Sequence, residues 1–275
     1  MRLMDLESLA ARVPDGSRLA MPPDNSLPSV ALAKALIRRG ARGLRLVGVP
    51  TSGFATDMLV GAGCVAEVET SAVSLGEAGF APRFSAALKA GEILMKDATC
   101  PAIHTMLQAA EKGVPFMPLR GIIGSDILAH RPDWKVIDNP FAEAGGDPIV
   151  LLPALQPDFG VFHAVMADSR GNVWLGRKRE CATIAHASRA SLVTVERVVE
   201  GDFLADETLA PGCISATYID GIAIAERGAR PVALLDEYRM DTAYISDYAR
   251  MAKTAEGFRE WLAMHVFETR AAAAE

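Results

Sequence analysis

The chain contains 275 residues, of which 50% are hydrophobic and 23% charged, and its 28 basic against 34 acidic residues give a formal net charge of −6 at pH 7. This composition excludes disordered, collagen-like and low-complexity chains and predicts one globular domain over residues 1–275. The acidic balance, without a long run of Lys or Arg, argues against a nucleic-acid partner and against a polybasic membrane surface.

The amino terminus and the cysteines indicate the compartment. No apolar run approaches the roughly 20 residues that span a bilayer. Asp5 and Glu7 stand where a signal peptide would be basic and then apolar. The cysteines are far apart and form no C-x-x-C pair, as expected of reduced thiols. We therefore expect a cytoplasmic protein without a membrane segment. The cysteines are Cys64, Cys100, Cys181 and Cys213.

Helical and strand periods alternate along the chain, which predicts an α/β fold with an open, mostly parallel sheet flanked by helices. A first helix is expected to begin at Ser26 or Ser29 and to end at Gly40. The turn at 168–172 predicts a hairpin between the strands on either side of it. The other expected strands and helices are strands at 18–21, 43–49, 65–75, 114–119, 149–152, 159–167, 173–176, 191–199 and 214–225, and helices at 55–61, 82–90, 101–112, 181–189 and 254–267.

Small and hydroxyl-bearing residues follow one of the predicted strands. Thr51, Ser52, Gly53 and Phe54 come directly after the strand at 43–49 and open the helix at 55–61. Ligands of α/β sheets bind at the carboxyl ends of strands, so these residues could offer hydroxyl and N–H groups to a ligand. Ordinary capping of the helix by Thr51 or Ser52 explains the same pattern. The loop at 121–125 could line the same cleft with Gly124 and Ser125, or be a plain loop.

Other reactive residues fit structural roles. His163 lies within an apolar strand, where a histidine is more often a hydrogen-bonded core residue than a base. His104 and His186 have no partner at metal-binding spacing, so we expect no metal. Cys100 precedes Pro101 at a helix start and, without a histidine partner, is interpreted as inert. The chain contains no dinucleotide-binding glycine motif, no P-loop and no G-x-S-x-G elbow.

Several short sequence motifs, separated from one another along the chain, occur in a characteristic order between Val13 and Phe267. The longest, from Pro157 to Asn172, contains an Asp, an apolar run with His-Ala, and then Asp-x-x-Gly-Asn. In order and spacing these segments resemble the α subunit of family I coenzyme A-transferases, most closely the glutaconate CoA-transferase type. The shorter segments are Val-Pro-Asp-Gly at 13–16, Gly-Val-Pro-Phe-Met-Pro at 113–118, Ile-Asp-Asn-Pro-Phe at 137–141, Pro-Gly at 211–212 and Gly-Ala-Arg-Pro at 228–231.

The resemblance implies an enzyme that moves CoA between an acyl-CoA and a carboxylic acid, with CoA as a substrate and no further cofactor. It implies a homologous β subunit in an α2β2 heterotetramer, which carries the glutamate nucleophile. That carboxylate attacks the acyl-CoA thioester and gives a mixed anhydride. The CoA thiolate then returns to form a glutamyl-CoA thioester, from which a second acid takes the CoA. Backbone N–H groups must stabilise the oxyanion intermediates.

Glu77 is the carboxylate of this chain with a related context. It stands in Gly-Glu-Ala-Gly after a predicted strand, which is similar to the Glu-x-Gly context of the β-subunit nucleophile. Because the two subunits are homologous, Glu77 could be catalytic or only the counterpart of the nucleophile; a solvated turn acid is the third interpretation. The resemblance also implies that Ser74, near the mouth of the same sheet, contacts substrate.

One departure keeps other functions open. The family's α subunits carry a Gly-Gly-Phe stretch after the first strand, whereas this chain has Met21-Pro22-Pro23-Asp24. Proline removes the N–H donors that glycine would expose. The alternatives are therefore an acyl-CoA hydrolase or ring-opening subunit of the same fold and, outside catalysis, a small-molecule-sensing domain or an inactive scaffold. A sensor is disfavoured because no helix-turn-helix or basic face accompanies the fold.

Overall fold

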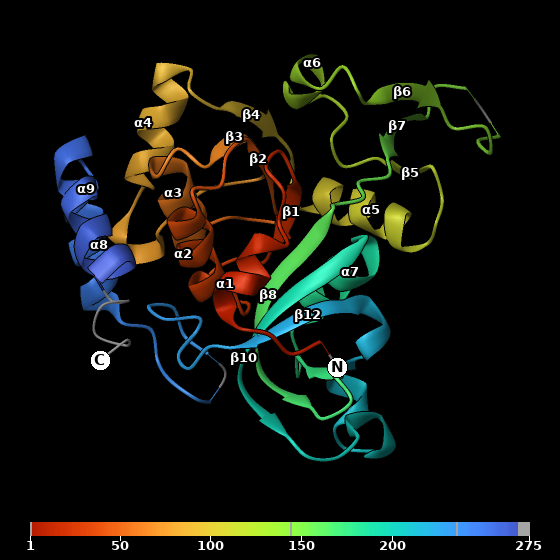
Figure 1. Ribbon diagram of the computed structural model, residues 1–275. Helices are drawn as coiled ribbons and strands as arrows, with labels where there is room; N and C mark the ends of the chain where they lie inside the picture. The colour runs from red at the N-terminus through yellow and green to blue at the C-terminus, as the bar shows by residue number, and fades with distance from the viewer. Residues whose placement is uncertain (1, 144, 235, 269–275) are drawn as a thin grey trace.

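A twisted, mostly parallel sheet forms the centre of the protein. The computed structural model describes residues 2–143, 145–234 and 236–268. Within these residues the parallel strands follow the order β4-β3-β2-β1-β8-β10-β12. At the carboxyl end of β8, β9 pairs antiparallel with β8, and β11 pairs antiparallel with β9. Helices α2, α3 and α4 cover one face and α5 and α7 the other (Figure 1). The predicted α/β fold with a parallel sheet is confirmed.

The helices and strands have the following bounds. The strands of the main sheet are β1 (Arg18–Met21), β2 (Leu44–Gly48), β3 (Val65–Thr70), β4 (Leu94–Asp97), β8 (Phe159–Asp168), β9 (Val173–Trp174), β10 (Ala190–Val199), β11 (Cys213–Ile214) and β12 (Ile219–Ile224). The helices are α1 (Leu6–Ala11), α2 (Val30–Arg39), α3 (Phe54–Gly61), α4 (Pro82–Ala90), α5 (Cys100–Glu111), α6 (Ile127–His130), α7 (Arg179–Ala187), α8 (Thr242–Met251) and α9 (Ala255–Leu262). In the part of the chain that the structure describes, none of the helices has the length and hydropathy needed to cross a membrane.

Two predicted strands have different bounds in the structure, because hydroxyl side chains form hydrogen bonds with the backbone at these points. The strand expected at 65–75 ends at Thr70, whose hydroxyl donates to the carbonyls of Pro50 and Ala72. The strand expected at 214–225 is split into β11 and β12 by a 3₁₀ turn over Ala216–Tyr218 that Ser215 caps. The segments that form β4, β6 (Lys135–Asp138) and α8 were not expected to be regular elements.

Two apolar cores lie on opposite faces of the sheet. On the face of α2 and α3, Phe54 packs edge-on against Tyr248 of α8 and its ring centroid lies 4.8 Å away. Tyr248 makes the same kind of contact with Trp261 of α9, also at 4.8 Å. All three side chains are fully buried. These edge-to-face contacts and the apolar area they bury hold α8 and α9 against α3.

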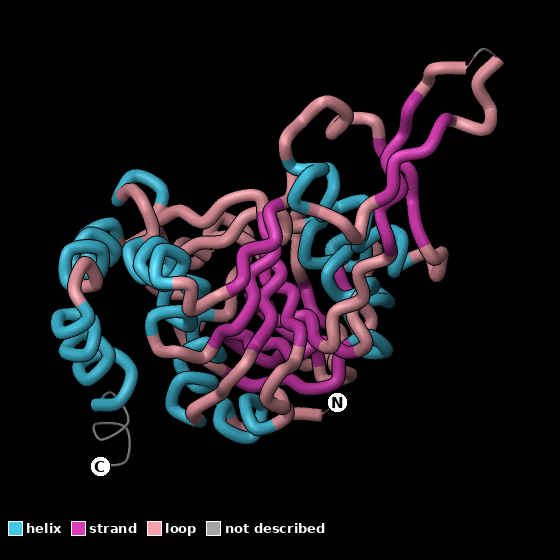
Figure 2. The backbone as a smooth tube through the Cα atoms, turned by 90° about the horizontal axis from the view of Figure 1, so that it is seen from above, coloured by secondary structure: helices cyan, strands magenta, loops and turns pink. Residues whose placement is uncertain are grey.

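A second sheet lies outside the main one. In the described part of the chain, β5 (Phe116–Leu119), β7 (Pro148–Pro153) and β6 pair antiparallel in that order. Figure 2 shows them standing away from the main sheet, and we call this hairpin sheet, residues 116–153, the arm. Its strands β5 and β7 match the strands predicted at 114–119 and 149–152, but their antiparallel pairing in a separate sheet was not predicted. Its outer strand β6 is exposed along its whole length.

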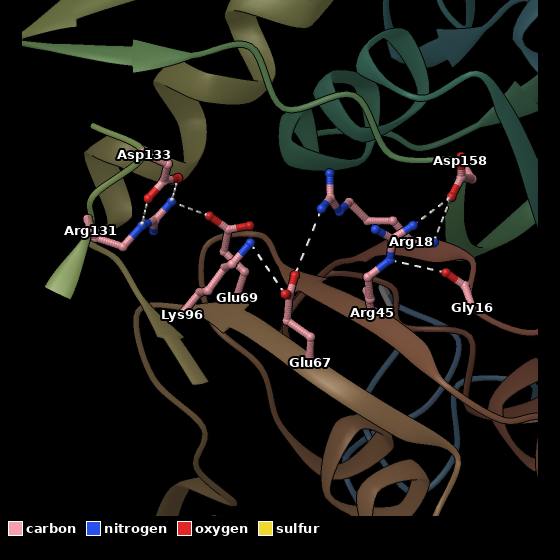
Figure 3. Close-up of polar contacts among 9 residues, drawn as sticks. All are labelled: Gly16, Arg18, Arg45, Glu67, Glu69, Lys96, Arg131, Asp133 and Asp158. Atoms are coloured by element: carbon pink, nitrogen blue, oxygen red, sulfur yellow. Dashed lines mark hydrogen bonds and ion pairs between the residues drawn. The ribbon is translucent and has the colours of Figure 1, made fainter. Parts of the chain in front are cut away.

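Charged side chains join the arm to the main sheet. Arg131, just before β6, is buried and donates to Glu69 of β3 at 2.7 Å and to Asp133 at 2.8 Å. Its guanidinium also lies 4.0 Å from the Trp134 ring centroid. Glu67 continues this charged row toward Lys96 of β4 (Figure 3). The same face of the sheet that is apolar under α5 and α7 is therefore charged near the arm.

Candidate functional site

A pocket of about 810 Å³ opens where β1, β2 and β3 end. The loops that follow these three strands form one side of it, and the start of α8 forms the other. This is the edge at which open parallel sheets bind ligands. The lining residues are Pro23, Asp24, Asn25, Thr51, Ser52, Gly53, Ala72, Ser74, Leu75, Gly76, Glu77, Ala78, Met240, Thr242, Ile245 and Ser246.

The loops after β2 and β3 are held together by their backbones. The Ser52 N–H donates to the carbonyl of Ala72 at 2.9 Å, and the Ser74 N–H donates to the carbonyl of Ser52 at 3.1 Å. This pairing extends the β2–β3 contact beyond the regular strands. It brings Thr51, Ser52 and Gly53, which were singled out from the sequence, beside Ser74 and Glu77 in one pocket.

Phe54, the fourth residue of that segment, lies beneath the pocket rather than in it. Its side chain is fully buried in the aromatic contacts with Tyr248 and α9. Its backbone N–H is taken as well, since it donates to the two carboxylate oxygens of Asp24 at 2.9 and 3.1 Å. Phe54 therefore supports the floor of the pocket, and the structure gives it no contact surface for substrate.

Asp24 takes the position of a capping residue for α3. The N-cap residue of this helix is Gly53, which has no side chain to accept an N–H, and the carboxylate of Asp24 fills that role from the loop after β1. A Cβ at Gly53 would lie 2.2 Å from Asp24 Oδ2. Burial, countered by the Phe54 N–H and reinforced by the charge of Asp57, raises the pKa of Asp24 to about 6.

Glu77 is presented at the rim of the pocket. It occupies the centre of a 3₁₀ turn over Gly76–Ala78, and its side chain is exposed. The Ser74 hydroxyl accepts the N–H of Gly76 at 3.1 Å, and Gly76 and Gly79 adopt positive φ angles of 63° and 95°. Ser74 thus shapes the turn that displays Glu77. In the described residues Glu77 makes no ion pair or side-chain hydrogen bond.

Gly124 and Ser125 lie elsewhere. They belong to the exposed turn between β5 and α6, in the arm. Neither residue lines the pocket at the ends of β1, β2 and β3.

His163 and Cys100 do not line the pocket. His163 is fully buried, with Nδ1 2.8 Å from the Thr194 hydroxyl and Nε2 2.8 Å from Glu196. It lies outside the pocket, as part of a buried network. Cys100 has an exposed side chain and lies 3.2 Å from the Ser71 hydroxyl. Over the described ranges, no group of three His, Cys, Asp or Glu residues is arranged to hold a metal ion.

Sequence reasoning missed two parts of the pocket. Asp24 was mentioned only as part of the stretch that replaces the family's Gly-Gly-Phe. It could have been predicted as a pocket residue, because it follows the carboxyl end of a strand, as Thr51 does. The wall formed by Met240, Thr242 and Ser246 was missed because α8 was not recognised. Asp241, whose side chain accepts the Tyr244 N–H, is the N-cap signal that could have located this helix.

Most of the chain matches the model of one enzyme family. The family model "Coenzyme A transferase" matches residues 3–219. The chain therefore belongs to the coenzyme A transferase family, and its relatives identify it as an α-subunit member of family I.

Curated relatives cover most of the chain. It is 28% identical over 274 residues to the A subunit of 3-oxoadipate CoA-transferase from Pseudomonas knackmussii, covering 96% of this chain and 93% of that one. It is 30% identical over 250 residues to the cholesterol ring-cleaving hydrolase IpdA subunit of Rhodococcus jostii, covering 86% and 82%. An uncharacterized protein of Archaeoglobus fulgidus is 29% identical over 245 residues, and the chain spans only 53% of its length.

Solved structures show the same fold. Glutaconate coenzyme A-transferase from Acidaminococcus fermentans superposes with a TM-score of 0.88 at 26% identity, covering 98% of this chain and 89% of that one. A variant of the decarboxylase AibA/AibB superposes with a TM-score of 0.81 at 26% identity, covering 95% and 98%.

Proposed function

We propose that the chain is the α subunit of a two-chain enzyme that moves CoA between an acyl-CoA and a carboxylic acid. The observation that carries the proposal is the pocket at the ends of β1, β2 and β3 in a chain that belongs to the coenzyme A transferase family. Relatives named as the A subunits of CoA-transferases support a partner chain. We further propose a homologous β subunit, an α2β2 assembly, a cytoplasmic location and no cofactor beyond CoA as substrate.

In this proposal the partner supplies the nucleophilic glutamate. Its carboxylate oxygen attacks the thioester carbonyl, the C–S bond breaks, and the mixed anhydride forms as CoA thiolate leaves. The thiolate then attacks the glutamyl carbonyl of the anhydride, which releases the first carboxylate and leaves glutamyl-CoA. A second carboxylate takes the CoA by the reverse of these steps. Glu77, exposed at the rim, borders the site without carrying the acyl group.

This chain's residues would bind the acyl group and offer donors to the oxyanion. The prolines after β1 have no N–H, and Phe54 donates to Asp24, so neither supplies a donor to a ligand. Within the described residues the N–H groups of Thr51 and Gly53 donate to no other residue, and both line the pocket. We assign oxyanion stabilisation from this chain to these two N–H groups, with the Ser74 hydroxyl positioned toward the acyl group.

The test is to purify the tagged chain with its partner from the source cell and incubate the complex with an acyl-CoA and borohydride. Borohydride reduces a glutamyl-CoA thioester to an alcohol, which intact mass and peptide mapping locate. A reduced glutamate on the co-purifying chain supports the proposal, and a sample without acyl-CoA is the control. A reduced Glu77 would instead place the nucleophile on this chain. A full transferase turnover by this chain alone would overturn the two-subunit arrangement.

One observation favours a second function. Asp24 brings a carboxyl group with a pKa of about 6 to the pocket wall. A carboxylate so placed could accept a proton from water, as an acyl-CoA hydrolase or a ring-opening enzyme requires. The Rhodococcus jostii relative is named as a ring-cleaving hydrolase. Free CoA accumulating without transfer to an added acid, or a ring-opened acyl-CoA product, would select this function.

A further inference from the structure

A positively charged groove continues from the pocket. It consists of two adjoining hollows of about 360 Å³ each, which share Arg227 and Arg230. The first of them also shares Met240 and Thr242 with the pocket at the ends of β1, β2 and β3. We call these two hollows the cationic groove. Its charged lining consists of the cations Lys34, Arg227, Arg230 and Arg239 and the carboxylates Glu226 and Asp241.

The charges of the groove are not balanced within the chain. Arg230 pairs with Asp241 at 2.7 Å. In the described residues Lys34, Arg227 and Arg239 form no ion pair with a carboxylate. Four cations against two carboxylates thus concentrate positive charge on a protein with a formal net charge of −6.

The charged form of Lys34 is destabilised by its surroundings in the groove. Its ammonium group lies 5.9 Å from the Tyr244 ring centroid and 6.0 Å from that of Trp261. Burial, together with the charges of Arg38 and Arg230, lowers its pKa to about 8. Burial and the charge of Lys34 also lower the pKa of His265. A multiply charged anion in the groove would relieve this repulsion.

A buried network holds the groove in shape. Glu196 accepts the N–H groups of Arg227 at 2.7 Å and Gly228 at 3.2 Å, and the Tyr238 hydroxyl at 2.9 Å. Arg227 has a φ of 55°, an uncommon backbone conformation for a residue other than glycine. His163 donates to the same carboxylate and contacts the Thr194 hydroxyl.

The network also reaches the helix that carries Lys34. The Thr194 hydroxyl lies 2.6 Å from the hydroxyl of Ser29, which caps α2. The N–H of Ala31, in the first turn of α2, donates to the carbonyl of Gly228 at 2.8 Å. Both sides of the cationic groove are thereby fixed to one another before any ligand arrives, which lowers the entropy cost of binding.

We propose that the cationic groove binds the phosphate groups of the CoA ester while the acyl end occupies the adjoining pocket. This inference rests on the proposed use of CoA esters. CoA carries its thiol at one end and a diphosphate and a 3′-phosphate at the other, so a site for the acyl thioester needs a cationic region farther along. Arg and Lys are the side chains that bind phosphate oxygens through charge-assisted hydrogen bonds.

The test compares the purified complex with a complex that contains Lys34→Met and Arg239→Gln. Lys34→Met keeps the apolar stem against the aromatic rings, and Arg239 is exposed, so the fold is expected to persist. Calorimetry measures the dissociation constants of CoA, dephospho-CoA and pantetheine. The double variant should bind CoA about tenfold more weakly per cation removed. Pantetheine, which has no phosphate, should bind both complexes equally.

Arg250→Gln, on α8 but outside the groove, is the matched control and should leave CoA binding unchanged. Unchanged CoA affinity in the double variant, with CoA transfer intact in the wild type, would overturn the groove assignment and leave the proposed function standing. Inorganic phosphate that binds the wild type as tightly as CoA would also overturn it. If the wild-type complex binds no CoA ester at all, the proposed function fails with it.

Discussion

The carboxylate of Asp24 accepts the backbone N–H of Phe54, and so a residue of the loop after β1 caps the helix that follows β2. The contact joins residues 30 positions apart in sequence and fixes two walls of the pocket to each other. Because Asp24 accepts the Phe54 N–H, this N–H is no longer free to bind a ligand.

This contact predicts a coupling between Asp24 and Gly53. Gly53→Ala should lower the free energy of unfolding by about 1–3 kcal/mol, because its Cβ would lie 2.2 Å from the carboxylate. In an Asp24→Ala background the same substitution should cost clearly less, since the crowded group is gone. Urea unfolding of the wild type and the three variants measures the difference. Equal costs in both backgrounds would contradict the coupling.

The raised pKa of Asp57 predicts that the stability of the protein depends on pH. It is fully buried, accepts the Phe84 N–H at 2.6 Å and the Tyr248 hydroxyl at 2.7 Å, and burial raises its pKa from 3.8 to about 6. At a pH between these two pKa values, Asp57 is protonated to a greater extent in the folded state than in the unfolded state. The contribution of Asp57 to the free energy of unfolding therefore falls as pH rises through this window and is constant above it.

Asp57→Asn tests this sign. The wild-type free energy of unfolding minus that of the variant should fall by about 2–3 kcal/mol between about pH 4 and pH 6.5 and then level off. The exposed Glu200→Gln is the control and should give a flat difference. A difference that rises with pH would show that the carboxylate is stabilised in the folded protein.

The Glu77→Gln variant distinguishes a nucleophile on the partner chain from a nucleophile on this chain. With the nucleophile on the partner, the substitution should change kcat of the complex less than about tenfold, because Glu77 only borders the pocket. A loss of about a thousandfold or more, with unchanged binding of acyl-CoA, would instead make Glu77 the acyl acceptor. Single-turnover kinetics of the complex distinguish these outcomes.

Arg131→Met should destabilise the protein by about 3 kcal/mol or more, because it leaves Glu69 charged and unpaired in a buried site. The Arg131→Met, Glu69→Leu double variant should recover part of this loss. Arg120 is the matched control, since its ion pair with Asp147 in the same arm is exposed and its loss should cost less than about 1 kcal/mol. Thermal unfolding of the four proteins ranks them, and equal losses at Arg131 and Arg120 would contradict the prediction.

The parallel core was predictable because its strands are short apolar runs separated by helices with clear ends, such as Gly40 with a φ of 75°. The arm was predictable only in part: β5 and β7 match the strands expected at 114–119 and 149–152, whereas β6 was missed because it is exposed along its whole length and has no apolar alternation. Thr51 and Ser52 were predictable as pocket residues because they follow a strand directly. The inward turn of Phe54 depends on α8 and α9, which are distant in sequence.

The pairing of β1 also has a consequence for synthesis. One edge of β1 pairs with β2, nearby in sequence, and the other pairs with β8, where Leu19 stands opposite Phe159. During translation β1 to β4 can assemble as successive strand–helix–strand units, while the second edge of β1 stays open until residue 159 has left the ribosome. Long-range pairing of this kind slows folding, so the nascent chain carries an unprotected strand edge from the synthesis of β1 until that of β8.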